Sequence, residues 1–158
     1  MIKVNVIAVG RVKEKYFADG ISEYAKRLSK YCDFKIFELP EENYKKVDDS
    51  IIKDIVKREG DRILSCSAFK GAIFAMAIEG KKFSSENLAQ KIKSLSDMGQ
   101  TITFVIGGSY GLDERVKSKA EQLVSFSDMT FPHTLFRLML VEQIYRAFCI
   151  KEGTPYHK

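Results

Sequence analysis

The sequence predicts an α/β fold. Segments of two kinds alternate along it: short runs of β-branched and apolar residues, and longer stretches whose apolar residues recur at helical spacing. The composition is that of an ordinary globular protein, with 45% hydrophobic and 30% charged residues and no repeat or low-complexity tract. A chain of 158 residues has the size of one domain, so we expect a single domain over residues 1–158.

The first half of the chain predicts two strands and two helices in alternation. Residues 2–9 (IKVNVIAV) are β-branched and nearly all apolar, which predicts a buried strand. Apolar residues at helical spacing predict a helix within 14–31, although this segment contains a glycine. FKIFEL (34–39) alternates like a strand before a proline. Residues 48–66 predict a second helix, which Gly60 interrupts.

The middle of the chain continues this alternation. AIFAMAI (72–78) is a predicted strand, and we expect Gly80 and the two lysines after it to form a turn. Either Ser84 or Ser85 has the spacing of an N-cap for the helix that follows. ITFVIGG (102–108) predicts a further strand, which runs into two glycines.

Two short elements precede a long final helix. Residues 113–123 predict a short helix and LVSFS (123–127) a short strand. The helix expected over about 133–150 is apolar on most faces, and such a helix needs to be covered on more than one side. Because a chain this small rarely covers it alone, we expect a subunit interface there.

The net charge of +5 is concentrated near the N-terminus, where residues 1–30 hold seven Lys or Arg against three Asp or Glu. A basic patch attracts phosphate backbones, although a solvated helix face explains the same charges equally well. The residues of the expected patch are Arg11, Lys13, Lys15, Lys26 and Arg27.

Composition also excludes several classes of protein. Three widely spaced cysteines and two histidines, with no CxxC pair, do not form the pattern of a zinc site, so we expect no metal and reduced thiols. No signal peptide is evident, and no apolar run approaches the ~20 residues that a membrane span needs. We therefore expect a cytoplasmic protein without a membrane segment.

VIGGSYGLDERV (105–116) is the most distinctive local sequence. A strand that runs directly into Gly107 and Gly108 lets a ligand approach the backbone, because no Cβ stands in the way. The P-loop pattern is absent, and a dinucleotide fingerprint would follow the first strand. The motif therefore favours a nucleoside-like ligand, with a plain glycine turn between strand and helix as the alternative.

Two later segments carry side chains suited to a binding site. The loop SFSDMTFPH (125–133) offers backbone donors and acceptors beside apolar side chains; its alternative is a plain connection. In the last helix, Glu142 and Arg146 are spaced for an ion pair. At the C-terminus, the aromatic ring of Tyr156 is suited to stack on a base, and the imidazole of His157 is suited to bind a phosphate or to move a proton. The alternative is an ordered tail without a function.

Five segments spanning nearly the whole chain are distinctive in combination: VIAVGRVKEKYFADGISEYAKRL, EGKKFSSENLA, FVIGGSYGL, SFSDMTFPH and VEQIYRAFCIKEGTPYHK. Together they resemble the ribosomal RNA large-subunit methyltransferase H family of the SPOUT superfamily. The resemblance implies a mostly parallel sheet flanked by helices, with a C-terminal trefoil knot, and it implies a homodimer. It also implies that S-adenosylmethionine is the cofactor and that N3 of a pseudouridine in large-subunit (23S) rRNA is methylated on the assembled ribosome.

The resemblance further implies the residues of the site. Those expected to contact the cofactor are Met76, Gly107, Gly108, Phe126, Ser127, Asp128, Met129, Thr130 and Phe131. Those that match proposed active-site positions are His133, Arg146, Tyr156 and His157.

Methylation of N3 requires loss of its proton. We expect His157 or Tyr156, from the tail of one subunit, to lie near the cofactor of the other and to remove or stabilise that charge; a solvent water is the alternative acceptor of the proton. Arg146 is expected to hold an RNA phosphate or the developing oxygen charge.

Two alternatives remain for the function of the protein: a SPOUT methyltransferase that acts on a tRNA ribose, and a non-catalytic RNA-binding or ribosome-assembly module.

Overall fold

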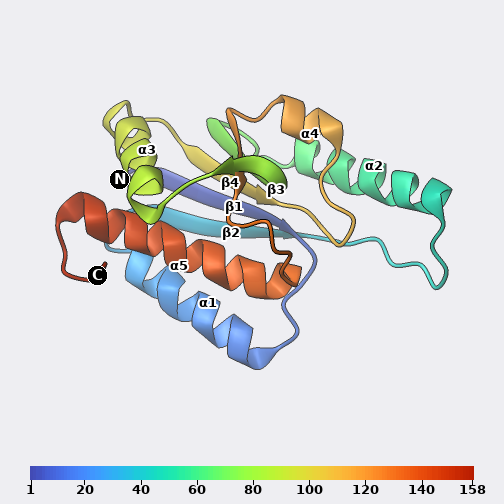
Figure 1. Cartoon of the computed structure of the whole chain (residues 1–158), viewed down its shortest axis with the longest axis horizontal. Helices are drawn as coiled ribbons and strands as arrows, with labels where there is room; N and C mark the ends of the chain where they lie inside the picture. Colours follow the sequence, from blue (N-terminus) through green and yellow to red (C-terminus); the bar gives the residue numbers. More distant parts are fainter.

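Five strands and five helices alternate along the chain in the computed structural model, which describes residues 1–158 (Figure 1). They are β1 (Lys3–Val9), α1 (Lys15–Leu28), β2 (Asp33–Leu39), α2 (Asp49–Ser65), β3 (Ala72–Lys82), α3 (Ser85–Asp97), β4 (Ile102–Ile106), α4 (Glu114–Ser118), β5 (Gln122–Ser125) and α5 (His133–Glu152). The predicted alternation is confirmed, and every predicted strand and helix is present.

The strands form one sheet in the order β2-β1-β4-β3-β5, and all four pairings between neighbours are parallel. Strands that are covered on both faces are apolar along their whole length. Accordingly, all five residues of β4 and six of the seven residues of β1 are buried. The parallel sheet implied by the resemblance is confirmed. Its strands all end at the same edge, where loops lead into the helices.

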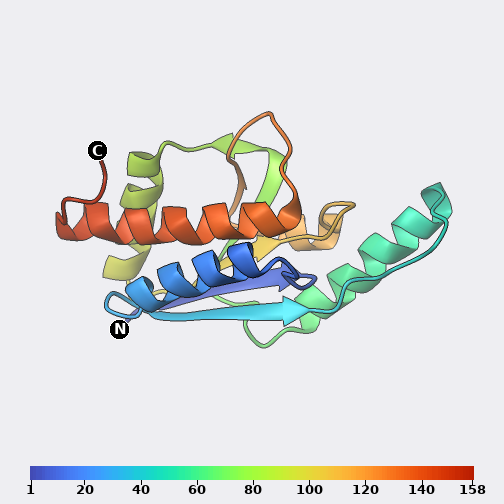
Figure 2. The same ribbon diagram turned by 90° about the horizontal axis from the view of Figure 1, so that it is seen from below.

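Helices cover both faces of the sheet (Figure 2). On one face α1, α3 and α5 pack in a core that contains Val6, Phe104 and Leu140. On the other face α2 and α4 contribute Ile63 and Val116 to a smaller core. One half of α2 extends beyond the sheet (Figure 2). Because side chains alternate between the two faces of a strand, β1 supplies residues to both cores.

Two expectations about glycines are wrong, for the same reason. β3 does not turn at Gly80 but continues to Lys82, pairing again with β5 after a register shift. A Cβ at Gly80 would lie 2.6 Å from the carbonyl carbon of Leu123, so glycine allows the backbone of β5 to approach. α2 runs through Gly60 without interruption, and there a Cβ would lie 2.5 Å from Asp113 Oδ2. Both glycines mark close packing rather than a break.

Replacing Gly80 with alanine is expected to lower the free energy of unfolding by about 1–3 kcal/mol, because backbone atoms of β5 must move. Gly20→Ala is the matched control. Its Cβ would lie 3.0 Å from Leu138 Cδ1, a flexible side chain, and alanine favours the helix. Urea denaturation measures both variants. Equal destabilisation by the two substitutions would contradict the close approach at Gly80.

The boundaries of some elements also differ from expectation. Ser84 is the N-cap of α3, since its Oγ accepts a hydrogen bond from the Asn87 amide at 3.0 Å. α4 covers only Glu114–Ser118 and is shorter than predicted, and β4 ends at Ile106, before the two glycines. The glycines therefore belong to the loop after the strand, which places them at the edge of the sheet.

α5 is covered on two sides by its own chain. α1 and α3 pack along it, and the ring of Tyr31, just after α1, stacks on Phe148 at 6.1 Å between centroids. Even the charged Arg137 of α5 is buried. Packing within the chain thus accounts for part of the apolar character of this helix, and the subunit interface expected there stays a prediction. None of the five helices has the length and apolar composition that a membrane span needs.

Candidate active site

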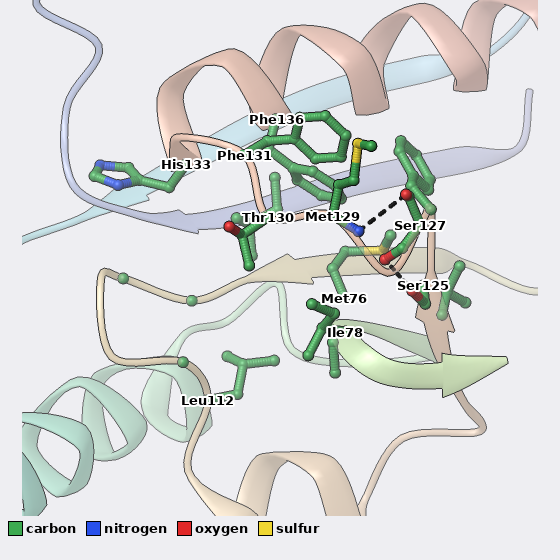
Figure 3. A pocket seen from close by; sticks show the side chains of 17 residues that line it. Met76, Ile78, Leu112, Ser125, Ser127, Met129, Thr130, Phe131, His133 and Phe136 are labelled. Carbon is green, nitrogen blue, oxygen red and sulfur yellow. Dashed lines mark hydrogen bonds between the residues drawn. The ribbon is translucent and has the colours of Figure 1, made fainter. Parts of the chain in front are cut away.

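A pocket with a cavity volume of about 180 Å³ lies at the carboxyl ends of β4 and β5, beside the middle of the longer β3 (Figure 3). Ten of its 17 lining residues are hydrophobic. Met76 and Ile78 of β3 form one wall, the glycine loop after β4 a second, and the loop after β5 a third. The first turn of α5 closes the pocket with His133 and Phe136. In parallel α/β sheets, ligands bind at this edge.

The glycine loop, residues 107–112, keeps its backbone open toward the pocket. A Cβ at Gly107 would lie 2.9 Å from the carbonyl oxygen of Gly111, so only glycine allows this tight turn. Gly111 itself has φ +85°, which favours glycine. An antiparallel bridge between Gly108 and Gly111 closes the loop. These contacts explain why a strand that ends in two glycines forms a pocket wall.

Residues 126–131 form the third wall, and local hydrogen bonds fix their path (Figure 3). Ser127 Oγ accepts from the Met129 amide at 3.0 Å, and Ser125 Oγ donates to the Ser127 carbonyl at 3.0 Å. The Phe126 ring packs against Phe136 at 4.8 Å between centroids. Met129 is 74% exposed, so its side chain is free to cover a ligand once one is bound.

Eight of the nine residues expected to contact a cofactor line this pocket. They are Met76, Gly107, Gly108, Phe126, Ser127, Met129, Thr130 and Phe131. Asp128 does not line it; its carboxylate points outward and pairs with Lys82 at 2.8 Å. Ile78 and Leu112 also line the pocket but were not expected from the sequence. The only signal for Ile78 was its place in the alternation of β3, and the only signal for Leu112 was its position just after the glycines.

His133 is the one expected active-site residue that lines the pocket. It begins α5, and its Nε2 lies 4.0 Å from Oε2 of Glu41 in the loop after β2. Gly10 packs below this pair: a Cβ there would lie 3.4 Å from each of the two side chains. The imidazole is thus held at the edge of the pocket nearest to the end of β1.

The other three expected active-site residues gather at the far end of α5. The Arg146 Nε donates to Glu142 Oε1 at 3.1 Å, which confirms the predicted ion pair. The Tyr156 hydroxyl donates to the same oxygen at 3.0 Å and lies 3.3 Å from the hydroxyl of Tyr24. Arg146 also covers the Tyr156 ring, 4.9 Å from its centroid. We call Tyr24, Glu142, Arg146, Tyr156 and His157 the C-terminal cluster.

The chemistry of the partners fixes the roles of the two His157 nitrogens. Arg146 Nη1 lies 3.1 Å from His157 Nδ1 and, being a guanidinium, only donates, so Nδ1 is the acceptor. Nε2 then carries the hydrogen and donates to Glu86 Oε1 at 2.7 Å. This hydrogen bond lowers the pKa of Glu86, which keeps it an acceptor.

Tyr156 is held in its protonated form. Burial, followed by its hydrogen bonds with Tyr24 and Glu142, raises the pKa of its phenol above the ordinary value. A phenol with a raised pKa donates hydrogen bonds and is a poor proton acceptor at neutral pH. Within the C-terminal cluster, His157 is therefore the better proton acceptor.

One chain does not bring all four residues together. His133 and Arg146 stand 13 positions apart on α5, and at 1.5 Å per residue they are separated by roughly 20 Å along the helix. The sequence offered no signal for Tyr24 or Glu86, because both reach the cluster from α1 and α3 through the tertiary fold.

Comparison with known proteins decides the family. The profile of the family described as "Predicted SPOUT methyltransferase" matches residues 2–157 of the chain. The chain belongs to the SPOUT methyltransferase family. Membership of this family implies the C-terminal trefoil knot expected from the sequence.

Close relatives of this SPOUT methyltransferase carry the name "Ribosomal RNA large subunit methyltransferase H". Those from Streptococcus uberis and Streptococcus thermophilus are 48% and 49% identical to it, and one from Lactobacillus delbrueckii subsp. bulgaricus is 45% identical. Each alignment covers 99% of this chain and 100% of the relative. The chain is therefore a methyltransferase of the H family and requires a methyl donor.

Proposed function

We propose that this SPOUT methyltransferase transfers a methyl group from S-adenosylmethionine to N3 of a pseudouridine in large-subunit ribosomal RNA. It acts on the assembled ribosome, in the cytoplasm, as a homodimer. The observation that carries the proposal is one pocket at the carboxyl ends of β4 and β5, beside the middle of β3, around which eight of nine expected cofactor residues assemble. The names of the relatives support ribosomal RNA as the substrate.

The pocket residues fit S-adenosylmethionine. Gly107 and Gly108 line the pocket with backbone alone, which offers N–H and C=O groups to a nucleoside, and the rings of Phe126 and Phe131 offer apolar contact. Ser127 and Thr130 add polar groups beside them. When bound, the cofactor supplies a methyl group on a positively charged sulfur.

The C-terminal cluster acts on the RNA in this proposal. Arg146 binds a phosphate or the oxygen next to N3 through its fork of N–H donors, and Tyr156 donates a hydrogen bond to the developing charge. His157 accepts the proton that N3 loses, which requires its Nδ1 to leave Arg146. Positioning of this kind contributes about 7–11 kcal/mol to barrier lowering when the geometry is good.

The homodimer follows from the separation of the two groups of residues. Because His133 lies at one end of α5 and the C-terminal cluster at the other, the tail folds back on α5 at the end far from the pocket of its own chain (Figure 2). We propose that the cluster of one subunit completes the pocket of its partner. Mixing a tail-deleted chain with a chain altered in the pocket tests this arrangement, since only a shared site restores activity in the heterodimer.

The decisive experiment is transfer from labelled S-adenosylmethionine to assembled ribosomes, free subunits and naked rRNA that lack the modification. A methyl group on the pseudouridine base, found by mass spectrometry only with assembled ribosomes, is the expected result. Resistance of the product to alkaline cleavage would instead indicate a ribose methyl, as in the tRNA alternative. Cofactor binding without transfer to any RNA would overturn the proposed substrate, and absence of cofactor binding would favour the non-catalytic module.

The basic patch near the N-terminus is proposed to hold the RNA backbone. Lys15 and Arg27 pair with Asp19 and Glu23 in the next or preceding turn of α1. Arg11, Lys13 and Lys26 are free of ion pairs. Arg11 and Lys13 line a hollow that also contains Glu41, the neighbour of His133, so they lie beside the mouth of the pocket.

Arg11→Ala and Lys13→Ala are each expected to weaken ribosome binding and to flatten its salt dependence. The log–log slope should fall by about 0.7–0.9 for each RNA phosphate that the variant no longer binds. Lys93→Ala is the control, because Lys93 lies on α3 and pairs with Asp97 at 2.8 Å. Binding measured from low to moderate salt checks the prediction, and slopes equal to the wild type in both variants would contradict it.

A further inference from the structure

Glu59 is a buried carboxyl group on α2 that lines a small hollow together with Glu41, Glu42, Ser109 and Tyr110. It occupies α2 between Ile55 and Ile63, at spacings of four residues, on the face that packs against the sheet. Glu59 is only 3% exposed, comparable to its two apolar neighbours. A helix position of this kind normally carries an apolar residue, and burial of a charge is costly unless the charge has a partner.

Only one of the two Glu59 oxygens has a partner. Oε2 accepts a hydrogen bond from the Glu42 amide at 3.1 Å, whereas Oε1 is buried without any hydrogen bond. Oε1 is directed at the glycine loop: a Cβ at Gly108 would lie 2.8 Å from it. The missing Cβ of Gly108 therefore lets the carboxylate contact the outer side of the same backbone that forms a wall of the pocket.

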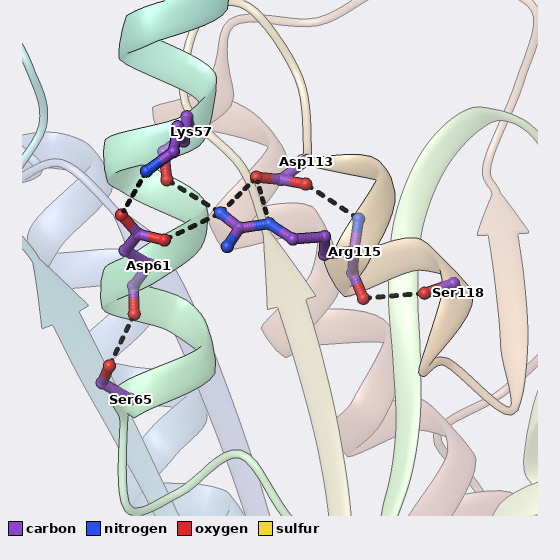
Figure 4. A network of polar contacts seen from close by, with 6 residues as sticks. All are labelled: Lys57, Asp61, Ser65, Asp113, Arg115 and Ser118. Carbon is purple, nitrogen blue, oxygen red and sulfur yellow. Dashed lines mark hydrogen bonds and ion pairs between the residues drawn. The ribbon is translucent and has the colours of Figure 1, made fainter.

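The glycine loop is fastened to α2 on the other side of Glu59 as well (Figure 4). Arg115 Nη2 donates to Asp61 at 2.8 Å and to Asp113 at 2.7 Å, and it also bonds the Lys57 carbonyl. Gly60 packs directly on Asp113. The Asp113 end of the loop is thus joined to α2 through Arg115, and at the other end Gly108 packs against Glu59, which places the carboxylate directly behind the pocket wall.

The pocket itself supplies no negative charge. None of its 17 lining residues is an Asp or a Glu, and most are apolar. The cofactor of the proposed function carries a sulfonium cation, while its ammonium and carboxylate groups balance each other. Of the nearby carboxylates, Glu41 lies 4.0 Å from His133 at the edge of the pocket, Glu42 pairs with Arg62, and Asp128 pairs with Lys82. Glu59 is the buried carboxylate at the wall that has no ion pair.

We propose that the buried carboxylate of Glu59 determines the preference of the pocket for the cationic cofactor over its neutral product, S-adenosylhomocysteine. The inference rests on the proposed function, since it needs S-adenosylmethionine in this pocket. A buried negative charge directly behind the backbone of the pocket wall attracts a cation more strongly than an exposed charge does, because water screens it less. Such a preference assists turnover, because the product loses this attraction once the methyl group has left the sulfur.

The titration of Glu59 agrees with this role. Burial raises its pKa, the Glu42 amide opposes this effect, and the carboxylate of Glu41 adds to it. An acid whose pKa is higher in the folded state destabilises the fold as pH rises through its pKa. Ionised Glu59 therefore costs stability in the empty protein, and a cation in the pocket offsets that cost.

The test is calorimetric binding of S-adenosylmethionine and S-adenosylhomocysteine to the wild type and to Glu59→Gln, without any RNA. The side chain of glutamine keeps the shape and the acceptor for the Glu42 amide but removes the charge. We expect Glu59→Gln to weaken S-adenosylmethionine binding by roughly tenfold and S-adenosylhomocysteine binding by less than about twofold. Glu114→Gln, an exposed change of the same charge on α4, is the control and should leave both affinities unchanged.

The outcomes separate the inference from the function on which it rests. If the wild type binds neither compound, the proposed function fails. If the wild type binds both and Glu59→Gln weakens both equally, or neither, the inference alone is overturned. A purely structural role for Glu59 would also lower the melting temperature, whereas loss of a destabilising buried charge should leave it equal or higher at neutral pH.

Discussion

Arg137→Ala is expected to lower the free energy of unfolding by about 3–5 kcal/mol, because it removes a buried side chain and its hydrogen bonds together. Arg137 lies on α5 and is 1% exposed. Its Nη2 donates to the Gly10 carbonyl at 3.0 Å, and its Nη1 pairs with Glu38. The substitution leaves that carbonyl without a donor and detaches α5 from the ends of β1 and β2. Urea denaturation followed by circular dichroism measures the change.

Two further variants separate the causes. Arg137→Met keeps most of the volume, so the loss should fall to about 1–3 kcal/mol, the cost of an unpaired buried carbonyl. Arg58→Ala removes an arginine from an exposed ion pair with Asp54 on α2 and should not change stability measurably. If Arg137→Ala and Arg58→Ala shift the unfolding midpoint alike, the anchoring role of Arg137 is wrong.

Deletion of residues 155–158 is expected to lower the turnover number by a factor of about 10²–10⁴, the usual contribution of a positioned acid–base group. The deletion removes Tyr156 and His157, which we propose as the hydrogen-bond donor and the proton acceptor of the C-terminal cluster. Stability should change little, because α5 ends at Glu152 with a left-handed Gly153 and does not need the tail. Single-turnover methyl transfer to ribosomes, beside thermal melts, measures both effects.

Three controls accompany this deletion. Removal of Lys158 alone leaves the cluster intact and should retain full turnover. Tyr156→Phe keeps the ring beneath Arg146 but loses the hydroxyl, so its effect reports the hydrogen-bond donor separately. Size-exclusion chromatography shows whether the dimer persists. Unchanged turnover in a tail-deleted protein that still dimerises would refute the role of the tail.

The order of elements was predictable because buried parallel strands and helices carry different periods of apolar residues. The structural role of single glycines was not predictable in this way. The local sequence around Gly60 indicates a helix break, and that around Gly80 indicates a turn. Instead, Gly60 makes room for Asp113 and Gly80 makes room for the backbone at Leu123, both of which are distant in the sequence. A sequence does not show which backbone will approach a glycine, so it does not distinguish a break from a close contact.

The pocket was more predictable than its surroundings. Gly107 and Gly108 follow a strand, and this position alone indicates an open backbone at the edge of a sheet. Met76 was found only through the resemblance to a family, because one methionine in an apolar strand carries no local signal. Glu59 did carry a signal, a charge at the position where spacing from Ile55 and Ile63 calls for an apolar residue.

The order of the strands also determines when this protein folds during its synthesis. β1 is made first but lies inside the sheet, and its partner on one side is β4: Val4 pairs with Ile102. The face of β1 that carries Val6 is covered by α5, the last helix of the chain. Contacts between such distant segments form slowly. A nascent chain can therefore pair β1 with β2 early but lacks the β4 neighbour of β1 for most of its synthesis, and it completes its core only when the final helix has been released.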